Sequence, residues 1–371
     1  MSCVVFTGGG TGGHIFPGIA VADVFKAETN IPVLWIGSKN QSDRTYVEAA
    51  GIPFYAIPSG KLRRYVSIQN ILDVFKVLAG CCAALVLLLR LKPAFVFSKG
   101  GFVSVPSCFA AWCLRIPVIT HECDISPGLA TKINARFAKK IITSYETTAS
   151  YFPARIQGKI QCMGNPVRLA FYTANAEQGK KHIGYKGSKP ILFVQGGSLG
   201  AQQINTLIEH SILFLTDHFF VVHQTGAQNL QDGERIAALL QKEAPAHAEH
   251  YRFFPFIAED MPHVLACAAL VVSRAGANSL WESAAAGKPL ILLPLTKAGS
   301  RGDQGENAAF FSSKGAALVL DSLSVNADSF CALLTQLLEH PEQMAAMAKQ
   351  AALLAENKPA LSIARLLRNF V

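Results

Sequence analysis

The stretch FTGGGTGGHIFPGIAVADVF, residues 6–25, decides the fold. It places five glycines between a short β-rich run, CVVFTG, and a helix-like segment, and it sets His14 where that helix should begin. Glycines let a chain turn tightly and let another molecule approach the backbone amides. The start of a helix carries partial positive charge, which suits a phosphate or a developing oxyanion. The stretch therefore predicts a strand, a glycine bend and a helix that can bind an anionic group.

The bend also fits the letters of a dinucleotide fingerprint, G-x-G-x-x-G, through Gly8, Gly10 and Gly13. Such a site has an Asp or Glu about 20 residues further on to bind the ribose. The second β-rich run, PVLWIGSKN, instead ends in glycine, serine and lysine. No Lys-Ser/Thr pair follows the bend, which excludes a Walker A loop. We therefore expect neither NAD(P) nor any other cofactor.

Both halves of the 371-residue chain alternate β-rich runs with helix-like segments, which indicates parallel sheets with crossover helices. Glycine bends also follow strands at SKGGFVS, 98–104, and QGGSLGA, 195–201. We expect an α/β protein of two Rossmann-like domains, 1–166 and 167–351, with these bends facing a central cleft at the C-terminal ends of the strands. A helix at about 352–371 is a candidate to pack back onto the first domain.

The amino-acid composition limits the cellular compartment and the kinds of binding partner that we expect. The nine cysteines show no C-x-x-C pair or metal-ligand spacing, and no cleavable signal peptide is recognisable, so we expect a reduced, cytoplasmic chain. Residues 1–166 hold 17 Lys/Arg against 8 Asp/Glu, whereas residues 167–371 hold 17 of each. The basic half suits an acidic partner. Nucleic acid is disfavoured, because no recognition motif or aromatic–basic platform is present.

The most apolar segment is NILDVFKVLAGCCAALVLLLRLKP, residues 70–93. Its uncharged core, Val77–Leu89, has 13 residues, fewer than the ~20 that span a bilayer, so we expect it not to cross one. It is either a buried crossover helix or a helix whose exposed apolar face enters the membrane interface. The basic run KLRRY, 61–65, favours the second alternative, because each basic side chain adds about 1 kcal/mol near an anionic leaflet.

Several motifs occur in a characteristic order: GGTGGH, GGFVSVP, HE at 121–122, GNPVR at 164–168, GGSLGA, and SRAGANSLWESAAAGKP at 273–289. In this order they resemble the MurG family, UDP-N-acetylglucosamine transferases that complete lipid II in peptidoglycan synthesis. The resemblance implies the glycosyltransferase B fold, with the donor mainly on the C-terminal domain and the lipid acceptor on the N-terminal one. It further implies a peripheral protein at the cytoplasmic face of the inner membrane, bound to its anionic surface.

The implied reaction is inverting transfer of GlcNAc from UDP-GlcNAc to undecaprenyl-pyrophosphoryl-MurNAc-pentapeptide, lipid I. The chain has no Asp-x-Asp to recruit a metal, so we expect no metal and neutralisation of the diphosphate by helix N-termini and backbone amides. The resemblance implies that the donor is bound by Thr11, Gly12, Gly13, Asp124, Arg168, Ser198, Ile257, Ala277, Asn278, Ser279, Leu280, Trp281, Glu282 and Gln304. Among these, Glu282 would accept hydrogen bonds from the ribose hydroxyls, Ile257 would contact uracil through its backbone amide and carbonyl, and Gln304 would meet the sugar hydroxyls.

Two residues are candidates for the general base. His14 follows the glycine bend, and an imidazole titrates near neutral pH. Asp124 stands where the family often has the asparagine of HEQN, since this chain reads HECDISPGL. A carboxylate there could accept the acceptor's proton or orient His14, while His121 and Glu122 brace the loop. The departure also keeps three alternatives open: a paralogous transferase with another lipid acceptor, a UDP-GlcNAc 2-epimerase, and a catalytically silent nucleotide-sugar-binding scaffold.

Overall fold

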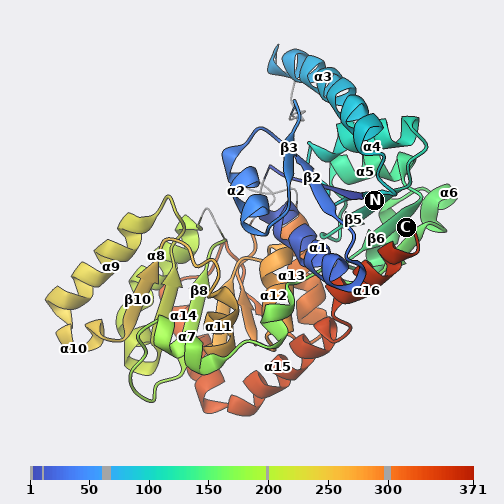
Figure 1. Ribbon diagram of the computed structural model, residues 1–371. Helices are drawn as coiled ribbons and strands as arrows, with labels where there is room; N and C mark the ends of the chain where they lie inside the picture. Colours follow the sequence, from blue (N-terminus) through green and yellow to red (C-terminus); the bar gives the residue numbers. More distant parts are fainter. Residues whose placement is uncertain (1–2, 11, 61–67, 198–199, 296–301) are drawn as a thin grey trace. The chain divides into compact units, whose positions relative to one another are not determined.

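The computed structural model describes residues 3–10, 12–60, 68–197, 200–295 and 302–371 (Figure 1). The chain divides into two compact units, one formed by Met1–Leu169 with Asn357–Val371 and the other by Ala170–Glu356. These boundaries fall later than the expected ones at 166 and 351. Each unit contains one parallel sheet with helices, so the α/β class predicted from the sequence is confirmed. Thr11, Ser198 and the basic run 61–65 lie outside the described residues.

The sheet of the first unit has the strand order β3-β2-β1-β4-β5-β6-β7, and every pairing in it is parallel. Its strands are β1 (Val4–Thr7), β2 (Val33–Gly37), β3 (Phe54–Ala56), β4 (Val96–Ser98), β5 (Val118–Glu122), β6 (Lys140–Thr143) and β7 (Ile160–Cys162). Its helices are α1 (Phe16–Thr29), α2 (Gln41–Ala49), α3 (Ile68–Leu91), α4 (Ser104–Cys113), α5 (Leu129–Phe137), α6 (Ala154–Gln157) and α16 (Pro359–Arg368), with 3₁₀ turns η1 (Gly12–His14) and η2 (Glu146–Tyr151).

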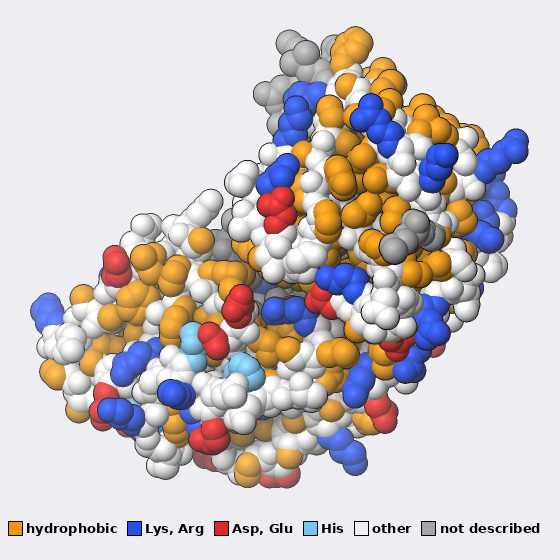
Figure 2. Space-filling model, in the orientation of Figure 1, with side chains coloured by type: hydrophobic (Ala, Val, Ile, Leu, Met, Phe, Trp, Pro, Cys, Tyr) orange, Lys and Arg blue, Asp and Glu red, His pale blue; other side chains and the backbone are white. Residues whose placement is uncertain are grey.

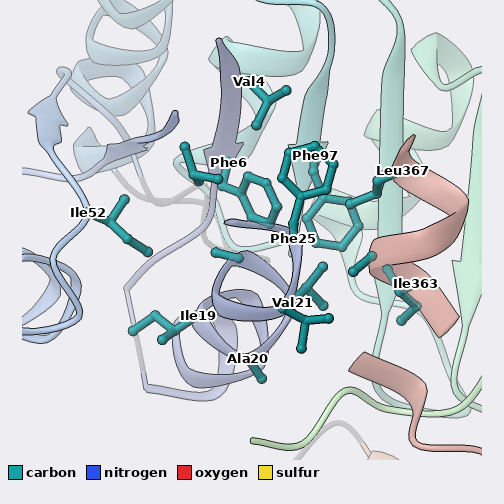
Figure 3. Packing of buried hydrophobic residues seen from close by; sticks show 14 of the residues in the cluster. Val4, Phe6, Ile19, Ala20, Val21, Phe25, Ile52, Phe97, Ile363 and Leu367 are labelled. Atoms are coloured by element: carbon teal, nitrogen blue, oxygen red, sulfur yellow. The ribbon is translucent and has the colours of Figure 1, made fainter. Parts of the chain in front are cut away.

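An aromatic core joins α1 and α16 to one face of this sheet (Figure 3). Phe6 of β1 and Phe97 of β4 lie with ring centroids 5.0 Å apart, and Phe25 of α1 joins the same cluster. Ile363 and Leu367 of α16 complete it. The last helix of the chain therefore belongs to the core of the first unit. Parallel strands are buried on both faces, which explains why β1 is a continuous apolar run rather than an alternating one.

The second unit has the strand order β10-β9-β8-β11-β12-β13, again entirely parallel. Its strands are β8 (Ile191–Gln195), β9 (Phe220–Gln224), β10 (Tyr251–Phe254), β11 (Leu270–Ser273), β12 (Leu290–Leu292) and β13 (Ala317–Val319). Its helices are α7 (Ala176–His182), α8 (Gln202–His218), α9 (Leu230–Glu243), α10 (Pro245–Ala248), α11 (Met261–Cys267), α12 (Ala277–Ala285), α13 (Asp303–Ser313), α14 (Ala327–Glu339) and α15 (Pro341–Ala355). A 3₁₀ turn, η3 (Leu169–Tyr172), runs across the boundary of the two units.

The two sheets share one topology. In each, the strand order reverses beside the first strand, between β1 and β4 and between β8 and β11. Open parallel sheets bind ligands outside the carboxyl ends of the strands at this point. The three glycine bends follow β1, β4 and β8, so all of them lie at the reversal point of their own sheet.

Candidate active site

A buried carboxylate holds the first glycine bend. Asp43 of α2 accepts a hydrogen bond from the Gly10 amide, 2.8 Å from Oδ2, and one from the Ser38 hydroxyl at 2.7 Å. A side chain at Gly9, whose φ is +156°, would collide with the same carboxylate. The acidic residue that follows β2 therefore fixes the bend instead of binding a ribose. This role was not predicted from the sequence, although Asp43 follows the second strand by only six residues.

His14 ends the turn η1, directly after Gly12 and Gly13, and is half-buried. Its Nδ1 lies 3.1 Å from the carbonyl oxygen of Lys99, the residue after β4. A carbonyl can only accept, so in the neutral ring Nδ1 carries the proton and Nε2 keeps the lone pair. The ring packs on Gly101, where an added Cβ would lie 3.2 Å from His14 Cδ2. The bends after β1 and β4 thus present the histidine with its basic nitrogen at Nε2.

Arg168 lies beside the same turn. Its guanidinium carbon is 5.9 Å from the centre of the Phe16 ring, and Phe16 begins α1 two residues after His14. A guanidinium over an aromatic face is electrostatically favourable. Of the residues predicted for the site, the structure therefore brings His14, Gly12, Gly13 and Arg168 to one corner of the first unit.

Glu122 anchors the loop that carries Asp124. Its Oε1 accepts bonds from the amides of Cys123 and Asp124 at 2.9 and 3.1 Å, and its Oε2 accepts from the Gly128 amide at 3.0 Å. These three bonds agree with the expectation that Glu122 braces the loop. Asp124 itself is half-buried, with the Cys123 thiol 3.8 Å from its Oδ2.

Within the described ranges, Glu122, Cys123 and Asp124 form the group whose ligand atoms lie close enough to hold a metal, within 4.8 Å of one another. A hard cation would need the carboxylate oxygens as ligands. Both oxygens of Glu122 already accept backbone amides, so the arrangement is explained by loop anchoring and we assign no metal to it.

A fully buried lysine and histidine lie behind this loop. Lys99 Nζ is 2.7 Å from His121 Nδ1 and 3.3 Å from Asn165 Oδ1, while His121 Nε2 is 3.0 Å from the carbonyl oxygen of Gly164. Burial lowers the pKa of Lys99. Burial and the nearby lysine hold the pKa of His121 well below its usual range. Sequence analysis did not single out Lys99 or Asn165.

In the second unit, α12 divides the predicted donor residues between two faces. Ala277, Leu280 and Trp281 are buried, and Trp281 meets Phe311 edge to face with centroids 6.0 Å apart. Their side chains belong to the core, so a role in donor binding would fall to their backbone. Asn278, Ser279 and Glu282 are half-buried on the other side of the helix. The amides of the first turn have no intrahelical acceptor.

Two further donor candidates are engaged within the protein. The amide of Ile257 donates to Gln224 Oε1 at 2.8 Å, and the expected contacts of its amide and carbonyl with uracil stay a prediction. Gln304 Oε1 accepts from the Leu295 amide at 2.9 Å, which fixes this side chain beside the segment that follows β12. Gln224, the last residue of β9, was not predicted from the sequence.

The third glycine bend lies close against β9. Gly197 and Gly200 have φ of +85° and +81°, and a side chain at Gly200 would collide with the carbonyl oxygen of Thr225. Only glycine fits such a position, because it combines a left-handed conformation with a close backbone approach. Its predicted ligand contact, Ser198, lies outside the described residues.

Comparisons with known proteins agree with this geometry. The chain matches the glycosyltransferase family 28 N-terminal domain over residues 4–143 and the family's C-terminal domain over residues 191–366. It is 53% identical to a Treponema denticola protein named UDP-N-acetylglucosamine–N-acetylmuramyl-(pentapeptide) pyrophosphoryl-undecaprenol N-acetylglucosamine transferase, covering 100% of this chain and 98% of that one. A Treponema pallidum protein of the same name is 48% identical over 100% of this chain and 96% of its own.

A solved MurG structure gives the same assignment. Acinetobacter baumannii MurG matches with a TM-score of 0.75 and 26% identity, covering 100% of both chains. A UDP-GlcNAc 2-epimerase from Neisseria meningitidis matches with a TM-score of 0.66 and 16% identity over 99% of this chain and 100% of its own, which shows a shared fold alone. With both family 28 domains and full-length identity of this size, the chain belongs to glycosyltransferase family 28 and, within it, to the MurG transferases.

Proposed function

We propose that this protein transfers N-acetylglucosamine from UDP-N-acetylglucosamine to undecaprenyl-pyrophosphoryl-MurNAc-pentapeptide, forming lipid II. The names of its full-length relatives support this substrate pair. The observation in the structure that supports it best is the placement of His14, whose Nδ1 is held by the Lys99 carbonyl at the reversal point of the first sheet.

The reaction is an inverting displacement. The acceptor hydroxyl oxygen attacks the anomeric carbon, the bond from that carbon to the diphosphate oxygen breaks, and UDP leaves with the electron pair. The hydroxyl proton passes to His14 Nε2, the nitrogen that keeps its lone pair when Nδ1 donates to Lys99. Asp124, on the loop anchored by Glu122, is the second candidate for the base.

The donor lies mainly on the second unit in this proposal. Glu282 of α12 accepts hydrogen bonds from the ribose hydroxyls, the backbone of Ile257 contacts uracil through its amide and carbonyl, and Gln304 contacts the sugar hydroxyls. The diphosphate is stabilised by amides of the glycine bends, by the first turn of α12 and by Arg168, without a metal. Charge-assisted bonds of this kind contribute about 1.5–3 kcal/mol each.

The membrane part of the proposal concerns α3. Its stretch Asp73–Leu91, 19 residues with a mean hydropathy of 2.2, is long and apolar enough to cross a membrane by length and composition alone. A crossing helix would place its two ends on opposite sides of a core about 30 Å thick. However, α3 connects β3 to β4, and both strands belong to one sheet. We therefore propose that α3 lies at the surface of the membrane.

The side chains of α3 support a peripheral role. Gly80, Ala84 and Leu88 are buried and mark the inner face of the helix, while Phe75 and Leu78 are 65% and 56% exposed. The outer face is thus apolar as well, unlike that of an ordinary surface helix. Figure 2 shows hydrophobic side chains gathered where Figure 1 places α3 and α4, with Lys and Arg side chains among them.

An aromatic cluster continues this surface on α4 and α5. Phe109, Trp112 and Phe137 lie with ring centroids 5.3–6.0 Å apart, and Trp112 is 52% exposed. Exposed basic residues on α3 and α5, or just after α3 and α4, are Lys76, Arg90, Lys92, Arg115, Lys132 and Arg136. Apolar burial and attraction to anionic lipid add up in such a surface. We propose that it binds the anionic cytoplasmic face of the inner membrane, where the lipid acceptor is presented.

The experiment that tests the proposed function is incubation with UDP-GlcNAc labelled in the sugar and purified lipid I, followed by separation of the lipid products. We expect label in a lipid product one GlcNAc larger than lipid I, with UDP released in equal amount. Conversion of UDP-GlcNAc to an epimerised sugar, with no labelled lipid, would instead identify an epimerase. Label in a different lipid acceptor, with lipid I inert, would identify a paralogous transferase, and binding of UDP-GlcNAc without turnover a silent scaffold.

A further inference from the structure

Lys99 is a lysine in a place where lysines are rarely found. Only 1% of its surface is exposed, and it directly follows β4. Its amide donates to the Thr7 carbonyl at 2.8 Å, so its backbone continues the ladder between β1 and β4. A lysine is almost never fully buried unless its amino group is paired, because removing the charge from water is unfavourable. The contacts of its amino group therefore indicate the role of Lys99.

The amino group of Lys99 connects two other segments of the site. It contacts Nδ1 of His121 at the end of β5, and it donates to Oδ1 of Asn165 in the GNPVR segment. The other ring nitrogen of His121, Nε2, faces the carbonyl of Gly164 and must carry the proton, because a carbonyl only accepts. His121 Nδ1 is therefore an acceptor for Lys99. One amino group thus ties the end of β5 to the segment that leads to Arg168.

The backbone of Lys99 contacts a third segment, the glycine bend that ends in His14, because its carbonyl oxygen lies 3.1 Å from His14 Nδ1. The charged and titratable groups around Lys99 are His14 on this side, His121 and Glu122 on β5, and Cys123 and Asp124 on the following loop. The carboxylates of Glu122 and Asp124 interact favourably with the ammonium. Lys99 therefore places a buried ammonium among the groups that could accept the proton.

We propose that Lys99 is a positioning residue for glycosyl transfer: it holds the segments bearing His14, Asp124 and Arg168 in one arrangement, and its positive charge favours the unprotonated form of the general base. This inference rests on the proposed function. It applies whether the base is His14 or Asp124, because a nearby positive charge disfavours protonation of an imidazole and of a carboxylate alike.

The test is Lys99→Met, which keeps the length of the side chain but removes its charge and both hydrogen bonds. We expect kcat to fall by roughly 10–100-fold, as for a displaced catalytic group, while KM for UDP-GlcNAc changes by less than about threefold. The acid limb of the kcat/KM profile should move to higher pH by about 0.5 unit or more, because the base binds its proton more readily once the ammonium is gone. Lys99→Arg, which keeps the charge, should leave the acid limb at the wild-type pH.

The matched control is Lys26→Met on the last turn of α1, the end remote from His14. Lys26 is half-buried, and its amino group donates to the carbonyl of Ala50. Lys26→Met should leave the acid limb of the kcat/KM profile at the wild-type pH. If Lys99→Met does not fold, as judged by thermal unfolding and UDP binding, Lys99→Gln is neutral and shorter and makes the same measurement.

A folded neutral variant whose acid limb stays at the wild-type pH would overturn the inference and leave Lys99 with a role in packing. NMR of ¹⁵N-labelled histidine provides a readout without turnover: His121 should be neutral with its proton on Nε2 in the wild type. A protein that is inactive as purified but shows this His121 signal would count against the proposed function, whereas an active protein with a protonated His121 would count against the role of Lys99.

Discussion

The two units repeat one topology but place different chemistry at the ends of their strands. In the first unit, β4 and β5 lead into Lys99, His121, Glu122 and Asp124, and the bend after β1 ends in His14. In the second, β8, β9 and β11 end in Gln195, Gln224 and Ser273, which are neutral hydrogen-bonding residues. Because the ends of the strands are equivalent positions in the two units, the difference in chemistry comes from the side chains at those positions. In the proposed reaction the first unit supplies the groups that move the proton, and the second supplies most of the hydrogen bonds that hold the nucleotide.

The largest effect expected from this comparison is at His14. His14→Ala should lower kcat by about 10²–10⁴ and leave UDP binding nearly unchanged, because it removes the proton acceptor but no nucleotide contact. Steady-state kinetics together with calorimetric titration of UDP would measure both quantities. A collapse of the rate in Asp124→Asn, with near-wild-type turnover in His14→Ala, would transfer the role to Asp124.

The matching change in the second unit is Glu282→Ala. Loss of a charge-assisted bond to the ribose should raise KM for UDP-GlcNAc by about 10–100-fold and change KM for the lipid acceptor little. Glu234→Ala, which removes an exposed acid on α9 of the same unit, is the control and should leave both KM values unchanged. Equal increases in both KM values for Glu282→Ala would mean that this carboxylate is not a ribose ligand.

Features formed by residues close together in the sequence could be predicted, whereas contacts between residues far apart in the sequence could not. The alternation of β-rich runs, bends and helices is local, and it predicted both Rossmann-like units. Asp43 and Gly10, Lys99 and Asn165, and Gln224 and Ile257 are far apart in the chain, and only the folded sheets bring them together. From the sequence alone, Lys99 of SKGG would be expected at the surface, but its position directly after β4 buries it. For α3, periodicity could not tell a buried helix from an exposed one, because both of its faces are apolar.

A third prediction concerns the brace of the first bend. Asp43→Ala leaves the Gly10 amide and the Ser38 hydroxyl without their acceptor, so the free energy of unfolding should fall by about 1–3 kcal/mol. Urea denaturation measures the change. Glu48→Ala, an exposed acid on the same helix, should change the free energy by less than about 0.5 kcal/mol. Equal effects of the two substitutions would show that Asp43 does not hold the bend.

The membrane surface of the first unit gives a fourth prediction. Leu78→Ser should weaken binding to vesicles of anionic phospholipid by about tenfold, since burial of one large apolar side chain contributes roughly 1.5–3 kcal/mol. Salt should weaken binding further by screening the basic side chains. Leu213→Ser is the control, because this leucine of the second unit is also exposed, at 46%. Unchanged sedimentation of Leu78→Ser with vesicles would place the contact elsewhere.

The smallest expected effect is the pH dependence of His223 in the second unit. Burial lowers its pKa to about 4, whereas an unfolded histidine titrates near 6.5. Between these values the unfolded chain binds the extra proton, so this contribution to stability is present above about pH 6.5 and is lost as the pH falls towards 4. His223→Gln should reduce the slope of unfolding free energy against pH, between pH 5 and 6, by up to about 1.4 kcal/mol per unit. An identical slope would show that His223 does not remain neutral in the fold.

The most direct test of the central claim, that the first unit moves the proton through His14, is the pH profile of kcat/KM for lipid I, measured for the wild type, His14→Ala and Asp124→Asn at saturating UDP-GlcNAc. The account predicts an acid limb in the wild type and in Asp124→Asn, and a residual rate in His14→Ala from which that limb has disappeared. An acid limb that persists in His14→Ala and disappears in Asp124→Asn would contradict it.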